Sequence, residues 1–507
     1  MSPRVAFVQA RMGMKVRRFR MATSSAAMIS GVVGAVAYVL SLLVDEEWQS
    51  VIFFVLTASA VVLAISWVAP TAKDQAGHID VFHPSILVIA FFFVYFIGSA
   101  AILVLLKDYR SDLVVLSPDT RKTVNAAMAL GILSVASFGL GARLSPFRID
   151  IDALQNRQLN GSVPVFILAA AFLTVGLVTR LYQLSMFGPV STDMLQYLSP
   201  GRRRELEIAV PQSLVILGSM ADWGALMLLV AMWTRTRRAS VMGPEVVMAV
   251  MVVIAMAILS FVISAKRSGV VLLALLPVIW AHYLNRRVSV PRMVVLSAGA
   301  LGIIAVALVA RVAVPLIVRG LDPTEYLGGT LSEVLWFYFE TAEFATFDVI
   351  AGTLLYRDQL LASIGDDAVA SFLRMTFATF TVFVPSAIWE GKPIYTDTGH
   401  YYFRYFTGSD ADVGLAVTSW GTAYLYFGVI GVIVGFVLLG WILKSGFIAF
   451  SPSRGAIGTV VLYSQFYWML FQFLRFGTIG FTFLYFIQAV MVGAIGVFMV
   501  THAARRR

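Results

Sequence analysis

The stretch from Arg319 to Gly414 begins RGLDPTEYLGG (319–329) and ends YFTGSDADVG (405–414), and it is the one long polar interruption in an otherwise apolar chain. On both sides of it, apolar runs follow one another with short polar connections. A helix of about 20 apolar residues spans the hydrocarbon core of a bilayer. The sequence therefore predicts an all-α polytopic integral membrane protein in which this stretch is one large loop.

The composition supports the same fold class. Of the 507 residues, 59% are hydrophobic and 13% are charged, whereas soluble domains carry roughly 25% charged residues. The net charge is +10, but the lysines and arginines form short clusters between apolar runs, where such clusters orient helices. We therefore expect no nucleic-acid partner. The chain has no cysteine, which excludes disulfide and thiolate chemistry.

The apolar runs predict about 12 transmembrane helices, nine before the large loop and three after it. They lie at 22–44, 50–70, 84–106, 123–142, 162–186, 212–233, 244–265, 268–284, 290–318, 415–442, 456–474 and 479–500. The chain then divides into a basic N-terminus (1–21), nine helices (22–318), the loop (319–414), three helices (415–500) and a basic C-terminus (501–507).

The charges between the runs predict the topology. The first run follows a basic segment and has no cleavage pattern, so it is interpreted as a retained signal anchor. With the N-terminus inside, the cytoplasmic connections and the C-terminus carry Arg143, Arg148, Arg157, Arg235, Arg237, Arg238, Arg286, Arg287, Arg292 and Arg505–Arg507. The first outward connection is instead acidic, with Asp45, Glu46 and Glu47. This asymmetry predicts that both termini are cytoplasmic and that the loop is periplasmic, in a bacterial inner membrane.

Cations on the outward side are not explained by topology. Lys266 and Arg267 lie in the turn AKRSG, Arg311 and Arg319 lie at the end of the ninth run, and Arg475 lies in the turn LRFGTIG. Cations from three separate turns suit a doubly anionic group such as a pyrophosphate, which guanidinium groups bind bidentately. For each arginine alone, snorkelling to lipid headgroups is the competing interpretation.

One carboxylate lies near the middle of a predicted span. Asp222, in SMADWG, needs an arginine partner, a water-filled cavity or a proton, because an isolated charge there is costly. We favour a structural buried pair over a catalytic role.

The large loop contains two apolar segments. LSEVLWFYFETAEFATFDV (331–349) has the periodicity of an amphipathic helix, with Glu333, Glu340, Glu343 and Asp348 on one face that we interpret as solvated. Glu340 or Glu343 is nevertheless a candidate general base. Residues 368–384 form a second, weaker apolar patch that is expected to re-enter the membrane edge.

The following segment, FVPSAIWEGKPIYTDTGHYYFRYF (383–406), is rich in aromatic residues. Aromatic faces pack on sugar rings, so the candidate glycan-binding residues are Trp389, Tyr395, Tyr401 and Tyr402. An interfacial aromatic belt is the competing interpretation. His400 is the one histidine in a predicted outward loop and a candidate acid or base, and Lys392 and Arg404 are further candidate pyrophosphate ligands. Asp410 and Asp412 are better explained by helix capping than by metal binding, so no metal is expected.

Four short motifs resemble one known family. FVPSAIWEGKP (383–393) is similar to a segment of the large outward loop of Wzy-type O-antigen and capsule repeat-unit polymerases, and TSWGTAYLYFGVIGVIVGFVLLG (418–440) to the span that follows it. SAKRSGVVLLALLPVIW (264–280) and FQFLRFG (471–477) resemble the arginine-bearing turns of that family. The resemblance covers roughly residues 255–480. It departs from the family at Ser386, where many members place an arginine.

The resemblance implies an inverting, metal-independent glycosyltransferase with a GT-C-like architecture and no cofactor. Its expected substrates are undecaprenyl-pyrophosphate-linked oligosaccharides of O-antigen, capsule or exopolysaccharide synthesis, and a chain-length regulator is a candidate partner. Arg267 and Arg475 would act on the departing pyrophosphate, with Lys266, Arg311 and Arg319 as further ligands. His400, Glu340 or Glu343 would deprotonate the attacking hydroxyl.

Other functions remain open at this point. An O-antigen ligase shares the layout and differs in its acceptor. A transferase that uses a polyprenyl-phosphate sugar usually has acidic residues in a large first outward loop, whereas here that loop is only DEEWQS (45–50). A lipid-linked glycan flippase or exporter needs a polar path through spans that, apart from Asp222 and Arg180, are nearly free of charge.

Overall fold

The computed structural model describes the chain in segments. They are residues 25–73, 78–98, 100, 120–146, 163–185, 212–236, 248–256, 267–284, 287–299, 346–364, 367–381, 389, 402, 405, 417–450, 452 and 457–477. Within these segments the chain is helical, and the one strand-like pairing is a bridge between Lys73 and Ile79. The all-α prediction is confirmed for this part of the chain.

Several of these helices have membrane-spanning character. Five are long and apolar enough to cross a bilayer: Ser25–Leu43, Trp48–Ala72, Lys122–Gly141, Phe166–Gln183 and Thr418–Phe450. Shorter apolar helices lie at Pro84–Gly98, Met220–Leu229, Leu273–Leu284, Val290–Gly299 and Ala368–Ala378. The protein is therefore a helical membrane protein. The last predicted run, 479–500, lies outside the described residues.

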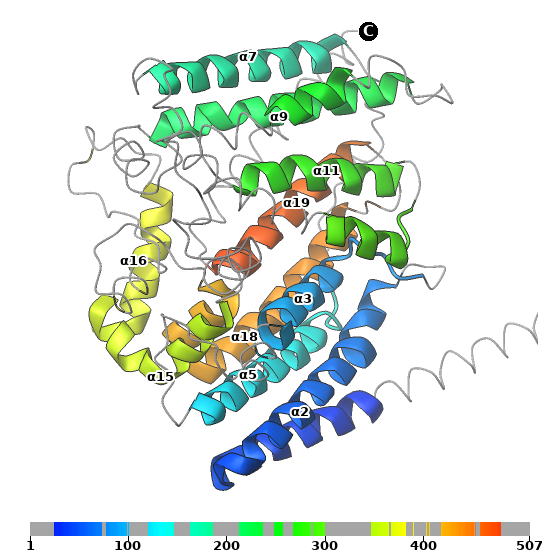
Figure 1. Ribbon diagram of the computed structural model, residues 1–507. Coiled ribbons are helices and arrows are strands. Elements are labelled where there is room, and N and C mark those ends of the chain that lie inside the picture. Colours follow the sequence, from blue (N-terminus) through cyan, green and yellow to red (C-terminus); the bar gives the residue numbers. More distant parts are fainter. Residues whose placement is uncertain are drawn as a thin grey trace, which may run out of the picture.

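Figure 1 shows the arrangement of the helices. A central group is formed by α2 (Glu46–Leu63), α3 (Pro84–Phe92), α5 (Thr120–Gly141), α11 (Arg267–Leu284), α18 (Thr418–Phe450) and α19 (Ile457–Phe476). The chain continues α2 through η1 (Ala64–Val68) and η2 (Ala69–Ala72), and α3 through η3 (Phe93–Gly98). α7 (Val163–Ser185) and α9 (Gln212–Thr236) lie side by side at the top, and α15 (Thr346–Ile364) and α16 (Ala368–Thr381) lie at the left.

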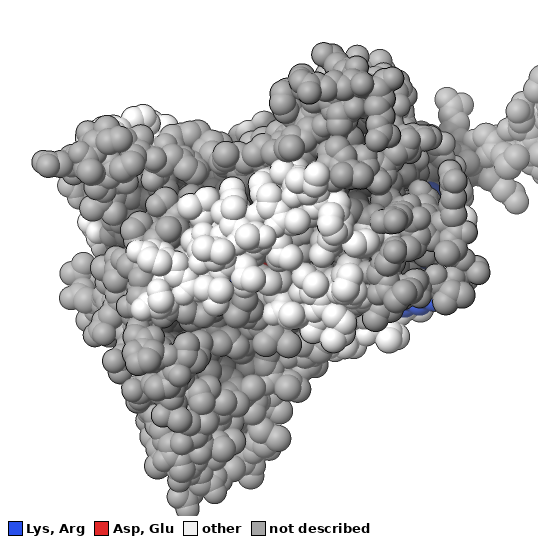
Figure 2. All heavy atoms as spheres, turned by 90° about the horizontal axis from the view of Figure 1, so that it is seen from above, with Lys and Arg blue, Asp and Glu red and all other residues white. Residues whose placement is uncertain are grey.

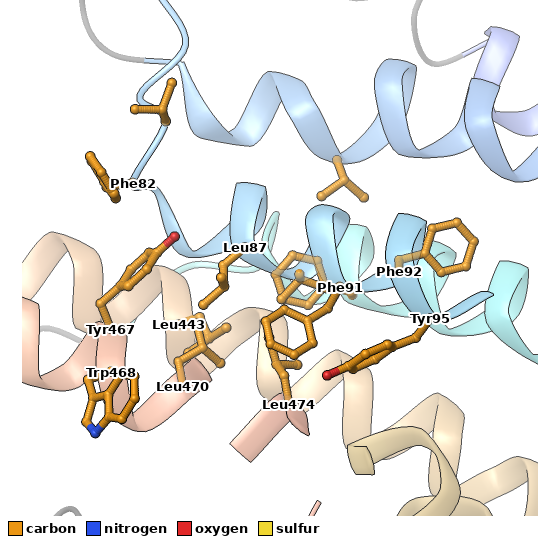
Figure 3. Close-up of a cluster of buried hydrophobic side chains, with 14 of the residues drawn as sticks. Phe82, Leu87, Phe91, Phe92, Tyr95, Leu443, Tyr467, Trp468, Leu470 and Leu474 are labelled. Atoms are coloured by element: carbon orange, nitrogen blue, oxygen red, sulfur yellow. The ribbon is translucent and has the colours of Figure 1, made fainter. Parts of the chain in front are cut away.

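Aromatic and branched side chains fill the centre of the group. α3 and α19 meet where Phe91 packs edge-on against Phe471, with ring centroids 5.2 Å apart (Figure 3). Leu443 of α18 and Leu474 of α19 are buried in the same cluster. Edge-to-face rings add specific geometry to the packing, so these contacts set the order of helices around the site.

Glycines let two pairs of helices approach closely. A Cβ at Gly176 of α7 or at Gly224 of α9 would fall within 3.0 Å of backbone of the other helix, which real Cβ atoms essentially never do. The same holds at Gly440 of α18, which lies against the backbone of α5 at Phe138. Small residues at such crossings are typical of helix packing in membranes, where close contact replaces the hydrophobic effect.

The outer face of α7 has the character of a lipid-facing surface. Seen from above in Figure 2, the described surface is almost entirely uncharged. The exposed apolar side chains of α7 include Phe166, Ile167, Val175, Val178 and Leu181. Because a bilayer solvates such a surface, this face needs no protein partner.

Two features of the loop and of the tenth predicted span differ from the sequence prediction. Asp348 was expected on a solvated face but is 3% exposed, because the first turn of α15 packs inward and Phe347 contacts Phe96. The helix predicted over 415–442 runs on to Phe450 and is interrupted at Gly428, which has a φ of 61°. The Nε atom of Arg357, on α15, donates to the carbonyls of Tyr424 (3.2 Å) and Leu425 (2.9 Å) in the turn before the break.

Candidate functional site

α11 and α19 bear the two predicted catalytic arginines that fall on described helices. The helices meet near the C-terminus of α11, where Trp280 Nε1 donates to Ser464 Oγ at 2.9 Å. Arg267 is the first residue of α11 and Arg475 lies in the last turn of α19. At 1.5 Å per residue, each is about 17–20 Å along its helix from this contact. Both arginines therefore lie at helix ends remote from the contact.

The end of α19 is fixed against the start of α18. Gly477 donates its N–H to the carbonyl of Phe473 at 2.8 Å, and its φ of 68° ends the helix after Phe476, one residue beyond Arg475. A Cβ on Gly477 would fall well inside 3.0 Å of the carbonyl of Thr418. The guanidinium carbon of Arg475 lies 4.9 Å from the ring centroid of Phe476. The motif LRFG thus brings the end of α19, two residues after Arg475, against the first turn of α18.

Helix α15, which lies within the predicted loop, packs at this same end. The ring of Phe96, at the far end of α3 and η3, contacts Phe347 of α15 at 6.1 Å and Trp420 of α18 at 5.4 Å. Because α3 starts at the opposite end of the group, these contacts place α15 and the first turn of α18 on the arginine side.

The structure corrects one predicted glycan-binding residue. Tyr402 is 0% exposed, and it shares a hydrogen bond of 2.5 Å with Thr353 Oγ1. Its ring belongs to a buried cluster with Val349 and Leu360, so neither face is open to a sugar. Burial raises the pKa of Tyr402 above its ordinary value. Trp389, in contrast, is 39% exposed.

Most other predicted site residues fall outside the described part of the chain. The structure gives the backbone of Arg267 but not its side chain. The remaining predicted residues are not described at all: Lys266, Arg311, Arg319, Glu340, Glu343, Lys392, Tyr395, His400, Tyr401 and Arg404.

Asp222 has an arginine partner. Arg180 of α7 donates from one terminal nitrogen to Asp222 Oδ2 of α9 at 2.7 Å, and both side chains are less than a tenth exposed. The other terminal nitrogen and Oδ1 have no partner among the described residues. A pair joined by one hydrogen bond between two tightly packed helices acts as a structural link, as expected for a buried charge in a span.

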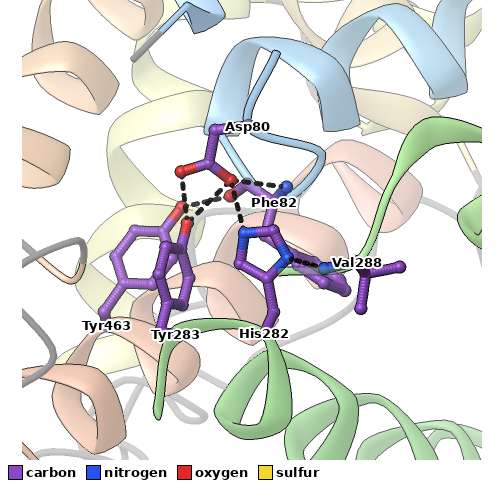
Figure 4. A network of polar contacts seen from close by, with 6 residues as sticks. All are labelled: Asp80, Phe82, His282, Tyr283, Val288 and Tyr463. Carbon is purple, nitrogen blue, oxygen red and sulfur yellow. Dashed lines mark hydrogen bonds and ion pairs between the residues drawn. The ribbon is translucent and has the colours of Figure 1, made fainter. Parts of the chain in front are cut away.

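A second polar network lies at the opposite end of α11 from Arg267 (Figure 4). Asp80, in the turn before α3, accepts hydrogen bonds from the backbone N–H of Phe82 at 3.0 Å and from the hydroxyl of Tyr283 at 2.9 and 3.0 Å. His282 Nε2 lies 3.3 Å from Asp80 Oδ1. The hydroxyl of Tyr463, on α19, donates to the carbonyl of Phe82.

The tautomer of a neutral His282 ring follows from these contacts. Its Nδ1 accepts the backbone N–H of Val288 at 2.9 Å, so the proton of a neutral ring lies on Nε2 and points at Asp80. The network joins α11, α19 and the turn before α3 into one rigid unit, which we call the Asp80 clasp. It lies at the predicted cytoplasmic end, about 22 Å along α11 from Arg267. Its side chains position helices and do not reach the arginine end.

Sequence reasoning missed the Asp80 clasp. Asp80, His282 and Tyr463 are separated by about 200 residues each, and no spacing rule links them. The one local signal is Asp80 ahead of His83 and Pro84, where His83 Nδ1 accepts the N–H of Ser85 and caps α3.

No protein-family profile, curated protein sequence or solved structure matches this chain.

Proposed function

We propose that the protein is a membrane glycosyltransferase that polymerises lipid-linked saccharide repeats on the periplasmic face of a bacterial inner membrane. In this proposal the chain has about 12 spans, both termini are cytoplasmic, and residues 319–414 form the periplasmic loop. The observation that supports it best is the position of Arg267 and Arg475 at helix ends remote from the Asp80 clasp. The loop helix α15 packs at that same end.

The proposed reaction is a single displacement. A hydroxyl of the lipid-linked repeat unit attacks the anomeric carbon of the growing glycan, and the bond from that carbon to the undecaprenyl pyrophosphate oxygen breaks. Arg267 and Arg475 stabilise the negative charge that develops on the pyrophosphate. His400, Glu340 or Glu343 takes the proton from the attacking hydroxyl. Because bond formation and departure occur on opposite faces, the anomeric configuration inverts.

The Asp80 clasp supports the part of this proposal in which the two arginines are held in fixed positions. It holds the proposed cytoplasmic end of α11 through the Asp80 carboxylate, which contacts Tyr283 and His282. It holds that end of α19 through the Tyr463 hydroxyl, which donates to the carbonyl of Phe82. Because the two helices are fixed relative to each other at one end, the positions of the arginine-bearing residues at the other end are restricted. Such preorganisation is what electrostatic stabilisation of a leaving group requires.

The test is the length distribution of surface and lipid-linked polysaccharide in a strain lacking the protein and in complemented strains. The wild-type gene restores long polymer, whereas Arg267→Ala and Arg475→Ala leave single lipid-linked repeats. Arg292→Ala is the matched control, because Arg292 is exposed and lies on the predicted cytoplasmic side. Long polymer in both arginine variants contradicts the pyrophosphate role.

The same experiment separates the alternatives. Full-length polymer that stays on undecaprenyl pyrophosphate indicates a ligase. Repeats trapped on the cytoplasmic side, with no change in what the periplasmic enzymes can join, indicate a flippase or exporter. An unchanged glycan profile rejects all three.

A further inference from the structure

The start of α18 lies against the end of α19, and the backbone at this junction is unusual. Thr418, the first residue of α18, has a φ of 61°, which is rare for a residue branched at Cβ. Its carbonyl lies against Gly477, the glycine that ends α19. Residues held in such sparsely populated conformations cluster at binding and catalytic sites. The strained Thr418 thus contacts Gly477, which follows Arg475 by two residues.

The same junction buries polar side chains that have no partner among the described residues. These are the hydroxyl of Ser419, the hydroxyl of Thr422 and both amide atoms of Gln472. The three side chains are 5%, 8% and 0% exposed. The Thr422 hydroxyl faces Gly477, since a Cβ on that glycine would lie 2.5 Å from it. Gln472 precedes Arg475 by one turn of α19.

Two buried hydroxyls on the adjacent helices α5 and α15, in contrast, have hydrogen-bond partners. Ser134 Oγ donates to the carbonyl of Gly131 at 2.6 Å and accepts from Trp420 Nε1 at 2.7 Å. Thr353 Oγ1 bonds both the carbonyl of Val349 and the hydroxyl of Tyr402. Buried polar groups in native proteins are normally satisfied in this way, so a cluster of unsatisfied ones needs an explanation.

We propose that Ser419, Thr422 and Gln472 form a subsite for the hydroxyl groups of a sugar ring, next to the anionic group that Arg475 contacts. This inference rests on the proposed function and adds the part of the substrate that the site selects. The three side chains are neutral and supply both donors and acceptors, which matches sugar hydroxyls, whereas a second phosphate would call for further cations. The sugar attached directly to the pyrophosphate is the ring that lies one bond away from the group held by Arg475.

A ligand subsite and a hydrated structural cluster differ in their effect on stability. Unsatisfied buried polar groups destabilise the protein without substrate, so replacing them by apolar groups of the same shape leaves the apo protein as stable or more stable. The same replacements weaken substrate binding. If internal water satisfies the groups instead, the replacements remove hydrogen bonds and lower stability.

The first experiment is thermal unfolding in detergent without substrate. Thr422→Val and Ser419→Ala are compared with Thr353→Val and Ser134→Ala, which make the same chemical changes at satisfied hydroxyls. We expect the melting temperature to stay unchanged or rise in the first two variants and to fall in the two controls. A fall in Thr422→Val and Ser419→Ala equal to that in the controls overturns the proposal in favour of bound water.

The second experiment measures binding in lipid nanodiscs. The probes are undecaprenyl pyrophosphate and the lipid-linked repeat extracted from the strain lacking the protein. We expect the wild type to prefer the repeat about tenfold, and Thr422→Val and Gln472→Leu to lose that preference while they bind undecaprenyl pyrophosphate normally. A preference kept in both variants overturns the sugar subsite and leaves the arginine role intact. If the wild type binds neither probe, the proposed function fails as well.

Discussion

The buried pair between Arg180 and Asp222 gives a prediction whose size follows from the structure. One hydrogen bond of 2.7 Å joins the pair, and the side chains are 8% and 7% exposed, so solvent does not screen them. Arg180→Met leaves the Asp222 carboxylate buried without its partner. Breaking a buried ion pair in this way costs about 3–5 kcal/mol, whereas replacing both partners by apolar groups of similar volume is close to neutral.

We therefore expect Arg180→Met and Asp222→Leu each to destabilise the protein by about 3 kcal/mol or more, and the double variant to recover to within about 1 kcal/mol of the wild type. Trp223, which is 4% exposed and adjacent to Asp222, reports local unfolding through its fluorescence in detergent. The double variant is the internal control, because it contains both packing changes. If Arg180→Met costs less than about 1 kcal/mol, the carboxylate is protonated or hydrated and the pairing argument is refuted.

Three further predictions follow from the backbone and from one histidine. Gly477→Ala places a Cβ against the carbonyl of Thr418, on a residue that keeps a left-handed backbone conformation. We expect this variant to lose about 2–4 kcal/mol of unfolding free energy and to make shorter polysaccharide. A melting temperature equal to that of the wild type contradicts the close approach. Burial lowers the pKa of His83 from 6.5 to about 4, so the unfolded chain binds a proton that the folded protein does not. Stability is then lost as the pH falls below 6.5, by about 2 kcal/mol between pH 7.5 and 5, and His83→Asn, which keeps the helix cap, should flatten this dependence in unfolding measured across that range. Arg357→Met leaves the carbonyls of α18 ahead of Gly428 without their donor. We expect a loss of only about 1–2 kcal/mol of unfolding free energy, because the Arg357 side chain is partly exposed. Proteolysis near Gly428 at the wild-type rate argues against this capping role.

The sequence determined the fold class through hydropathy alone. Apolar runs are long enough to be recognised without contacts, and in the described segments they are helices, five of them of spanning length. Local signals also worked where a single helix was involved. Residues 368–384 were predicted as an apolar patch, and Ala368–Thr381 within it form α16; the helix that bears Arg475 ends at a glycine.

The sequence was misleading where the partner of a residue is remote. The periodicity predicted Asp348 on a solvated face, and the aromatic composition predicted Tyr402 as a sugar-binding residue. Both side chains are buried, because α15 packs against its neighbours at the start of α18. The amphipathic pattern of a loop helix shows two faces but does not say which one the protein covers. Only the packing of distant helices decides that.

The tertiary structure alone produced the two features that now direct experiments. Asp80 and His282, which are separated by 202 positions in the sequence, are joined in the clasp. The unsatisfied polar groups of Ser419, Thr422 and Gln472 are buried where α19 ends against α18. Hydropathy encodes which segments enter the membrane, since each residue contributes to that free energy independently. Which polar groups meet depends on helix order, crossing and register, which are properties of pairs of segments and cannot be obtained from either segment by itself.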